Sequence, residues 1–451
     1  MSCAPKAIFE LKMGVFGFSL QPSAFSLFPM PYPRQIKYII GNEICERFSY
    51  YGMMGILELY LANRLNMGGP EATEVLHLFG ASVYFLPLLG GWIADRWLGR
   101  YWTILSISLF YCLGHGTLSA SEGSRTGLFA GLTLLAIGAG GIKPSVSAFV
   151  GDQFSASQEH LLTKVYGWFY WAINLGAAAA FFIIPWVRAR VGYSWAFGIP
   201  GIAMGLATLI FWLGRKYYVR QPPSRQAPRS ESEKAQDRLT LRRIGVVFLP
   251  VPMFWAVYNQ VNSTWVLQGG KMTPFHGLNG ETMQGAGAVL VMIWTPILTL
   301  VLYPLAARLG WRPSALRRMA AGMVLGALAF VVSGVIQARM DGGQTVSILW
   351  QLAPYVVLEA GEVLLSATGL EFAFEQAPAR LKSVVMSMWL MTIAAGHFLI
   401  AVFTSINENF IKARGAAQIY VYAGMLFVVA GIFMFCASRF RGREPMDLAH
   451  P

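Results

Sequence analysis

Twelve long apolar runs divide this sequence, and they constrain its fold more than any other feature. Each run approaches the ~20 residues that a helix needs to cross a hydrocarbon core of roughly 30 Å. Backbone polar groups in that core must be hydrogen-bonded within the chain, which long apolar runs achieve as helices. We therefore predict an all-α membrane protein with twelve transmembrane helices. The runs cover residues 36–61, 75–94, 101–118, 127–150, 165–187, 195–213, 244–267, 285–305, 315–336, 346–370, 384–406 and 419–435.

The composition excludes a soluble globular protein. Hydrophobic residues make up 55% of the 451 residues and charged residues only 13%, whereas about a quarter of the residues in a soluble domain are charged. The four cysteines, Cys3, Cys45, Cys112 and Cys436, have no spacing typical of a zinc site or a disulfide framework. We expect free thiols, no metal and no cofactor.

The positive charges predict how the chain is oriented and divided. With both termini in the cytoplasm, most of the 35 Lys and Arg residues fall on the cytoplasmic side, as the positive-inside rule requires. The net charge of +13 therefore indicates membrane topology rather than a nucleic-acid partner. We expect a multi-pass protein of the plasma membrane, which is the inner membrane in a bacterium, surrounded by lipid.

One long, basic and proline-containing connection separates six helices from six. We predict an N-terminal bundle at 34–214, a cytoplasmic linker at 215–243, a C-terminal bundle at 244–437 and a cytoplasmic tail at 438–451. Two six-helix halves joined in this way are typical of rocking-bundle transporters. Residues 1–33 contain an apolar stretch that prolines interrupt and that no small-residue cleavage site follows, so we expect a poorly defined extension rather than a signal peptide.

Three charged residues lie on one face of the first predicted helix. Glu43, Glu46 and Arg47 are three and four positions apart, so their side chains can meet. Each ionised residue at such a depth costs at least ~2.5–3.5 kcal/mol unless it is paired or hydrated. Two acids that share one guanidinium favour a proton on one of them. The cluster is therefore a candidate proton carrier; the alternative is an ion-pair network that only fixes the helix.

Two further groups of charges lie deep in predicted helices. Lys143 follows Gly140 and Gly141 in the fourth helix, and Glu359 and Glu362 lie one turn apart in the tenth. No other deeply placed acid is present in the second half, so Glu362 is the expected partner of Lys143. Both residues lie slightly past the middle of their helices, and a bond between them would close the cytoplasmic side of a central cavity. A structural role for Lys143, and packing or hydrogen bonding for Glu359, remain alternatives.

Several polar or aromatic side chains are placed at mid-helix depth, where each can contact a ligand or serve only packing. His77, near the outer end of the second helix, can be a proton relay or a satisfied interfacial histidine. The mid-helix residues are Asn174, Tyr50, Tyr51, Tyr84, Trp255 and Trp389.

These residues occur in recognisable strings. NEICERFSYYGM (42–53) resembles the Glu-x-x-Glu-Arg signature of the proton-dependent oligopeptide transporters (POT/PTR), a branch of the major facilitator superfamily. GGWIADRWLGR (90–100) is similar to the helix 2–3 loop motif of that superfamily. Four more strings resemble peptide-transporter signatures, and the combined set is specific. They are AGGIKPSVSAFVGDQF (139–154), FYWAINLGA (169–177), PMFWAVYNQ (252–260) and GEVLLSATGLEFAFEQAP (361–378).

The resemblance implies roles for the residues in these strings. Glu43, Glu46 and Arg47 would couple protons, together with His77, which matches a histidine found in animal and some bacterial members. Lys143 would bind the peptide carboxylate and Glu362 the peptide amino terminus. The remaining implied contacts are Asn174, Tyr50 and Tyr84 at the peptide backbone and Trp255 and Trp389 at its side chains.

The sequence also departs from the family. Met54 stands where Arg is usual, and Asn259 stands where an acid is usual. In relatives these two positions form a salt bridge that closes the outer side. Because both charges are absent together, neither is left unpaired in the membrane. We expect the outer gate to close by packing or neutral hydrogen bonds. The two helices that many bacterial members insert between the halves, and the large outer domain of animal members, do not fit this sequence.

The predicted function is proton-coupled symport of di- and tripeptides by alternating access, with peptide, protons and lipid as the partners and with no nucleic acid. One alternative keeps the fold and carries nitrate or another small organic anion, although an acid at Glu362 favours a zwitterion. Another is a substrate sensor that does not transport. An enzyme is not expected, because the sequence offers no nucleophile, metal cluster or cofactor motif. The oligomeric state is left open.

Overall fold

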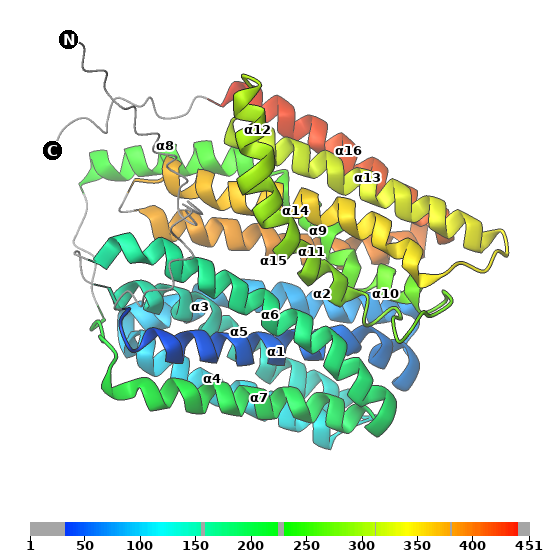
Figure 1. Ribbon diagram of the computed structural model, residues 1–451, viewed down its shortest axis with the longest axis horizontal. Coiled ribbons are helices and arrows are strands. Elements are labelled where there is room, and N and C mark those ends of the chain that lie inside the picture. Colours follow the sequence, from blue (N-terminus) through cyan, green and yellow to red (C-terminus); the bar gives the residue numbers. More distant parts are fainter. Residues whose placement is uncertain (1–31, 155–157, 224–229, 312, 379–380, 441–451) are drawn as a thin grey trace, which may run out of the picture.

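The computed structural model describes residues 32–154, 158–223, 230–311, 313–378 and 381–440. The predicted extension and most of the predicted tail lie outside these residues. The first half of the chain forms a bundle of α-helices with short π and 3₁₀ segments (Figure 1). Its elements are α1 (Ile36–Leu59), η2 (Tyr60–Arg64), α2 (Gly69–Phe85), α3 (Pro87–Ile93), η3 (Ala94–Leu98), α4 (Gly99–Ala120), α5 (Arg125–Asp152), α6 (Glu159–Val191), α7 (Tyr193–Leu213) and η5 (Gly214–Lys216).

The second half forms another bundle, in which several spans are built from two or three consecutive elements. These elements are α8 (Glu231–Phe248), α9 (Val251–Tyr258), η6 (Asn259–Asn262), α10 (Thr264–Gly269), α11 (Gln284–Pro296), η7 (Ile297–Leu302), α12 (Tyr303–Arg308), α13 (Ala315–Asp341), η8 (Ile348–Gln351), α14 (Leu352–Gln376), α15 (Lys382–Ile406), η10 (Asn407–Ile411) and α16 (Gly415–Arg439).

The fold class is confirmed, because helices occupy every apolar run that the sequence predicts. Among the described residues, nine helices are long and apolar enough to cross a membrane, or ten if the bent pair Glu231–Phe248 and Val251–Gly269 forms one span. One of the nine, Gly69–Ala120, contains two of the predicted runs. α1 is outside this set because its Glu-x-x-Glu-Arg segment interrupts its apolar character. With the bent pair counted as one span, Gly69–Ala120 counted as two and α1 added, the described residues contain twelve spans.

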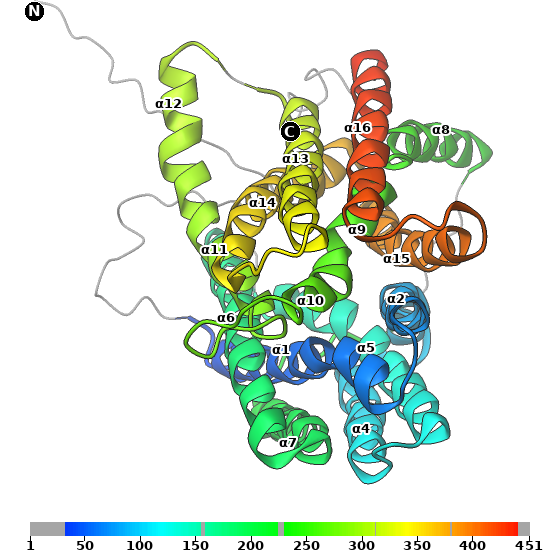
Figure 2. The same cartoon turned by 90° about the vertical axis from the view of Figure 1, so that its right-hand side faces the viewer.

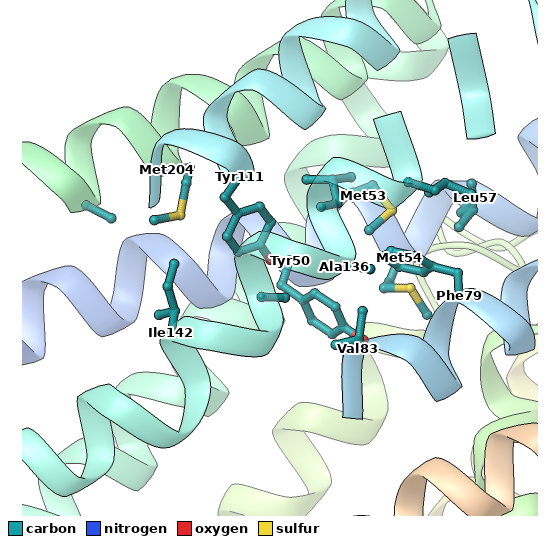
Figure 3. Packing of buried hydrophobic residues seen from close by; sticks show 14 of the residues in the cluster. Tyr50, Met53, Met54, Leu57, Phe79, Val83, Tyr111, Ala136, Ile142 and Met204 are labelled. Carbon is teal, nitrogen blue, oxygen red and sulfur yellow. The ribbon is translucent and has the colours of Figure 1, made fainter. Parts of the chain in front are cut away.

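Each half has its own hydrophobic core. The core of the first half is built from buried residues between Ile36 and Tyr218, and that of the second half from residues between Ile244 and Phe433. In the first core, Met54 of α1 lies beside Phe79 of α2, and Tyr50 of α1 lies beside Val83 (Figure 3). The buried side chains of each of these two cores come from one half of the chain, and a small third cluster packs Tyr170 of the first half against Val291, Leu298 and Val363 of the second.

The two bundles lie side by side and meet along two seams (Figure 2). α2 packs against α15, and α6 packs against α11. Large apolar side chains such as Trp102, Leu113 and Trp186 are exposed. An exposed apolar surface of this extent is typical of a protein that faces lipid.

The two ends of the molecule are named here by the path of the chain. The inner end is the one at which the described chain begins, before α1, and finishes, after α16 (Figure 1). The outer end is the opposite one, where η2 leads into α2 and α10 leads toward α11.

The segment predicted as a linker, residues 215–243, is helical from Glu231 onward. α8 begins at Glu231 and continues to Phe248. Its first turn carries a capping box, in which Ser230 Oγ accepts a hydrogen bond from the Glu233 N–H and the Glu233 carboxylate accepts one from the Ser230 N–H. Lys234 forms an ion pair with Glu231 at 2.7 Å. Hydropathy alone did not reveal this extension, because it depends on polar capping.

Candidate functional site

The charged residues of α1 form one buried cluster. Arg47 Nε donates a hydrogen bond to Glu43 Oε1 at 2.6 Å and lies 3.1 Å from Glu46 Oε2. Both acids are buried, and within the described chain neither Glu46 oxygen accepts a hydrogen bond. The cluster therefore has an ion-paired, hydrogen-bonded acid beside one that is ion-paired only.

α6 approaches this cluster closely because Gly176 has no side chain. A Cβ atom at Gly176 would lie 2.6 Å from the Ile44 carbonyl oxygen and 3.0 Å from Arg47 Cβ. Such close backbone approach is typical of small residues between membrane helices. Asn174 on the same helix is largely buried and donates from Nδ2 to the Tyr170 carbonyl at 3.0 Å. The close contact between α1 and α6 positions Asn174 at the central cavity.

Lys143 on α5 lies between two tyrosines. Its Nζ is 3.8 Å from the ring centroid of Tyr50 on α1 and 4.5 Å from that of Tyr84 on α2. The aromatic faces stabilise the ammonium group, and Nζ is buried without a hydrogen-bond partner in the described chain. Three of the predicted site residues thus meet at one point.

A central cavity of about 250 Å³ lies between the two bundles. Both bundles contribute to its wall, and so do two positions at which the sequence departs from the family, Met54 and Asn259. Glu359 and His397, which the sequence did not assign to a site, also line it. The predicted substrate-binding residues at the wall are Tyr50, Tyr84, Asn174, Trp255 and Glu362.

Two predicted substrate contacts do not reach the cavity wall. Trp389 is 1% exposed and packs behind Trp255, with ring centroids 6.2 Å apart, and against Phe248 at 5.3 Å. It supports the wall rather than forming it. Lys143 also stands behind the wall, which Tyr50 and Tyr84 form in front of it.

The structure does not join Lys143 to Glu362. No ion pair between them occurs among the described residues, and Lys143 Nζ and Glu362 Oε2 are both buried without a hydrogen-bond partner. The expected contact of an inner gate is therefore absent in this conformation. A buried charge without a partner is costly. A ligand that forms hydrogen bonds with these two groups would therefore be stabilised by them.

A second cavity continues from Glu362 toward the inner end. It has a volume of about 110 Å³ and shares Glu362 and Ser366 with the central cavity. Arg318 and Glu371 line its inner part, where Arg318 donates to Glu371 at 3.1 Å. Glu362 thus stands at the passage between the centre of the molecule and its inner end.

Glu359 takes a more definite position than the sequence predicted. It is 1% exposed, and its Oε2 accepts a hydrogen bond from Tyr258 Oη at 3.2 Å. This bond joins α14 to α9 within the second bundle. The expectation of a hydrogen-bonding role agrees with this contact, and the side chain also contributes to the cavity wall.

The outer end is closed by contacts between the bundles that the sequence did not suggest. Arg188 at the end of α6 forms an ion pair with Glu281, which precedes α11, at 2.7 Å. Gln284 donates from Nε2 to the Gly55 carbonyl at 3.0 Å. Asn259 bonds within its own helix, to the Trp255 carbonyl. The expectation of closure by packing and neutral hydrogen bonds alone was therefore incomplete, because an ion pair is present at another position.

Glu281 lies in the connection before α11, and burial raises its pKa from 4.5 to about 7, although Arg188 opposes this shift. A buried carboxyl group with a raised pKa binds a proton more tightly than a hydrated one. Burial of the Glu281 carboxyl group therefore favours the closed outer end most at low pH, and this stabilisation decreases as the pH rises from 4.5 to about 7.

Arg188→Ala is expected to open the outer end, because it leaves the Glu281 carboxylate buried without a cation. Removing one partner of a buried ion pair costs more than neutralising the pair. Because the Arg188 side chain is 26% exposed, the cost here is reduced, and we expect about a tenfold rise in the outward-open population. Glu281→Gln keeps a hydrogen-bond acceptor without charge and should have a smaller effect. Spin-label distances across the outer end measure both. Equal populations in the two variants and the wild type would contradict this assignment.

The fold and the cavity define a class of protein. Two helical bundles around a central, polar cavity, closed at one end by contacts between the bundles, form a membrane transporter of the major facilitator type. Solved structures support this class. An auto-inhibited POT family peptide transporter has a TM-score of 0.86 and 37% identity, covering 93% of this chain and 99% of that chain. The POT family transporter PepTSo has a TM-score of 0.84 and 36% identity, covering 91% and 99%.

The sequence comparisons specify the family. The model of the POT family matches residues 101–235 and 224–420. Mouse solute carrier family 15 member 2 is 38% identical over 367 residues, which are 70% of this chain and 50% of that protein. Human solute carrier family 15 member 1 is 36% identical over 372 residues, 69% of this chain and 52% of that protein. The chain belongs to the POT family. It spans about half the length of the curated relatives it matches.

Proposed function

We propose that this protein is a proton-coupled symporter that imports di- and tripeptides by alternating access. The observation that carries the proposal is the position of Glu362, an acid with an unpartnered oxygen at the wall of a central cavity, across from the Lys143 ammonium behind Tyr50 and Tyr84. A free peptide has one charge of each sign. Several relatives are described as peptide transporters.

Substrate binding would use the cavity wall on both bundles. Glu362 would bind the peptide amino terminus. Lys143 would bind the carboxylate once the tyrosine rings in front of it move aside, and Tyr50, Tyr84 and Asn174 would contact the backbone. Of the two tryptophans, Trp255 would contact the side chains and Trp389 would hold it in position. The buried, unpaired groups at both charged sites would gain hydrogen bonds from the peptide.

Proton coupling would use the cluster of α1. A proton on Glu46 removes a carboxylate that lacks a hydrogen-bond donor, while Arg47 keeps its bond to Glu43. His77 would act at the outer end. Release of the proton to the inner side would restore the full attraction of Arg47 for both acids. The cluster is thus suited to carry one proton in each cycle, and no cofactor is required.

Alternating access would exchange the contacts at the two ends. In the present conformation the outer end is closed by Arg188–Glu281 and the inner cavity adjoins Glu362. Closure of the inner side would bring Lys143 and Glu362 together as an inner gate. Bound peptide competes for both groups, so it would favour reopening. The halves that move would be residues 34–214 and 244–437.

We also propose the location. The protein would lie in the plasma membrane, or in the inner membrane of a bacterium, with both termini and the basic segment 215–243 in the cytoplasm. The distribution of Lys and Arg supports this orientation. The inner end defined above would then face the cytoplasm.

Uptake into proteoliposomes tests the function. Labelled dialanine is expected to accumulate only with an inward proton gradient, and N-acetyl-dialanine, which lacks the positive amino group, should compete at least about tenfold more weakly because the Glu362 contact is lost. Nitrate serves as the second competitor. Accumulation of nitrate without peptide uptake would support an anion carrier, and binding of dialanine without uptake would support a sensor.

A further inference from the structure

A buried acid of α14 that the proposed cycle does not use lies at the wall of the central cavity. Glu359 is 1% exposed and lines the cavity one turn before Glu362. Its Oε2 accepts the hydrogen bond from Tyr258 Oη, and within the described chain no donor reaches its Oε1. One oxygen of this carboxyl group is therefore open to a ligand that enters the cavity.

α11 leaves room for the Glu359 carboxyl group because Gly287 has no side chain. A Cβ atom at Gly287 would lie 2.6 Å from Glu359 Oε1 and 3.5 Å from Cε1 of Tyr355. At the first of these distances the carboxyl group would have to shift. Gly287 lines the central cavity as well. The carboxyl group thus occupies a notch in the part of the wall that α11 forms.

Aromatic side chains flank Glu359 at the cavity wall. Tyr258 on α9 donates to it, and Tyr355 lies one turn before it on α14. Trp255 stands edge-on to Tyr258, with ring centroids 5.7 Å apart. These three aromatic residues all line the cavity, and aromatic rings beside a carboxylate attract positive charge. Trp255 Nε1 is buried without a hydrogen-bond partner in the described chain, so a carbonyl group of a ligand can accept from it.

The wall of the central cavity carries negative charge. Among the described residues that line it, Glu359 and Glu362 are the acids, and none is Lys or Arg. A dipeptide with uncharged side chains brings one ammonium group, which Glu362 would bind, and leaves Glu359 without a cation. A buried acid with no cation nearby is costly in its charged form, so the cavity favours a ligand that supplies a second positive charge.

We propose that Glu359 and the aromatic side chains that flank it form a subsite for a positively charged side chain on the first residue of the peptide. Dipeptides that begin with lysine or arginine are then preferred substrates. The first residue is the one whose amino group lies at Glu362, a placement for which this inference rests on the proposed function. A lysine ammonium on its flexible four-carbon stem reaches an acid one helical turn away, ~5.4 Å along the axis.

The subsite lies within one bundle. Its residues belong to α9, α11 and α14, which are all parts of the second half of the chain. A movement of the two bundles against each other therefore leaves the subsite intact, and its preference for a charged side chain can be measured as binding, without transport.

Equilibrium binding of dipeptides to the full chain in lipid nanodiscs tests the subsite. Lysyl-alanine is compared with norleucyl-alanine, whose side chain has the same four carbons but no ammonium group. In the wild type, lysyl-alanine is expected to have a Kd about tenfold lower, because only its side chain forms a charge-assisted hydrogen bond with Glu359. Alanyl-lysine, which has the charge on its second residue, should gain less than about threefold over alanyl-norleucine.

Glu359→Gln keeps an acceptor for Tyr258 but removes the charge, so the Kd ratio of the first two dipeptides should fall below about twofold. Glu58→Gln is the matched control. Glu58 is also 1% exposed and also accepts a hydrogen bond from a hydroxyl group on another helix, that of Thr73, but it does not line the cavity. This variant should keep the tenfold ratio. Glu362→Gln should weaken the binding of both dipeptides and keep a ratio of at least about tenfold.

Equal Kd values for lysyl-alanine and norleucyl-alanine in the wild type, or a tenfold ratio that persists in Glu359→Gln, would overturn this inference, while binding of dialanine would still support a peptide cargo. If Glu359→Gln is not recovered as folded protein, the comparison with alanyl-lysine decides, because an equal gain from either position of the charge also overturns the subsite. Absence of binding by every dipeptide would overturn both the subsite and the proposed cargo. Preferential binding of lysyl-alanine without proton-driven uptake would contradict the symport and support the subsite.

Discussion

Glu46→Gln is expected to abolish the proton-driven accumulation of dialanine in proteoliposomes. Glutamine resembles the protonated acid in shape and charge, so the variant can bind peptide but cannot release a proton on the inner side. Both Glu46 oxygens are buried without a hydrogen-bond donor, and a neutral side chain is therefore tolerated there. Exchange of external for internal dialanine, which needs no net movement of protons, should continue. Uptake and exchange are measured on the same vesicles.

The control for this experiment is Glu58→Gln. Glu58 is a buried acid on the same helix, 1% exposed, but its hydrogen bond comes from Thr73 at 2.8 Å and it lies apart from the cluster. This variant should accumulate dialanine as the wild type does. If Glu46→Gln still accumulates dialanine against a gradient, the cluster does not carry the coupled proton.

Lys143→Ala and Glu362→Ala are each expected to reduce dialanine uptake about tenfold to a hundredfold. A hydrogen bond to a charged group contributes about 1.5–3 kcal/mol, and each variant removes one of the two charged contacts proposed for the peptide. For Lys143→Ala the loss should appear mainly as a higher KM for dialanine. Initial rates over a range of peptide concentrations measure it.

Two comparisons separate a binding role from a general effect. Lys216→Ala removes an exposed lysine at the inner end and should leave uptake unchanged. N-acetyl-dialanine should lose its disadvantage as a competitor in Glu362→Ala, since the contact that distinguishes the two ligands is gone. Full uptake by both Lys143→Ala and Glu362→Ala would disprove the assignment of these residues to the peptide and to the inner gate.

The parts of this structure that depend on local sequence were predictable. Hydropathy located the spanning helices, and the spacing of Glu43, Glu46 and Arg47 placed them in contact. The N-terminal end of α8 was missed because a polar capping box extends that helix beyond its apolar residues. The boundaries of a helix and the contacts within it can be predicted from a short stretch of sequence, provided that capping residues are considered along with hydropathy.

Contacts between the halves were not predictable in the same way. Lys143 was expected to meet Glu362, yet it lies between Tyr50 and Tyr84, because the partner of a charge at a moving interface depends on the conformation. The ion pair of Arg188 with Glu281 joins residues 93 positions apart. His397 carries no motif, and only the position of α15 against α2 brings it to His77. Predicting such pairings requires knowledge of how the two bundles are placed relative to each other.

The separation of the hydrophobic interior into two cores has an energetic consequence for transport. A rotation of one bundle against the other leaves the contacts within the two large cores intact, so most of the apolar packing is not involved in such a motion, whereas the small cluster of Val291, Leu298 and Val363 with Tyr170 is. Only the side chains along the seams change neighbours, and these include the ion pair of Arg188 with Glu281 and the histidines His77 and His397. The difference between the two orientations can then be a few kcal/mol, which the binding of a small ligand is able to reverse. A molecule built this way keeps its two halves as units and responds to small ligands that bind between them.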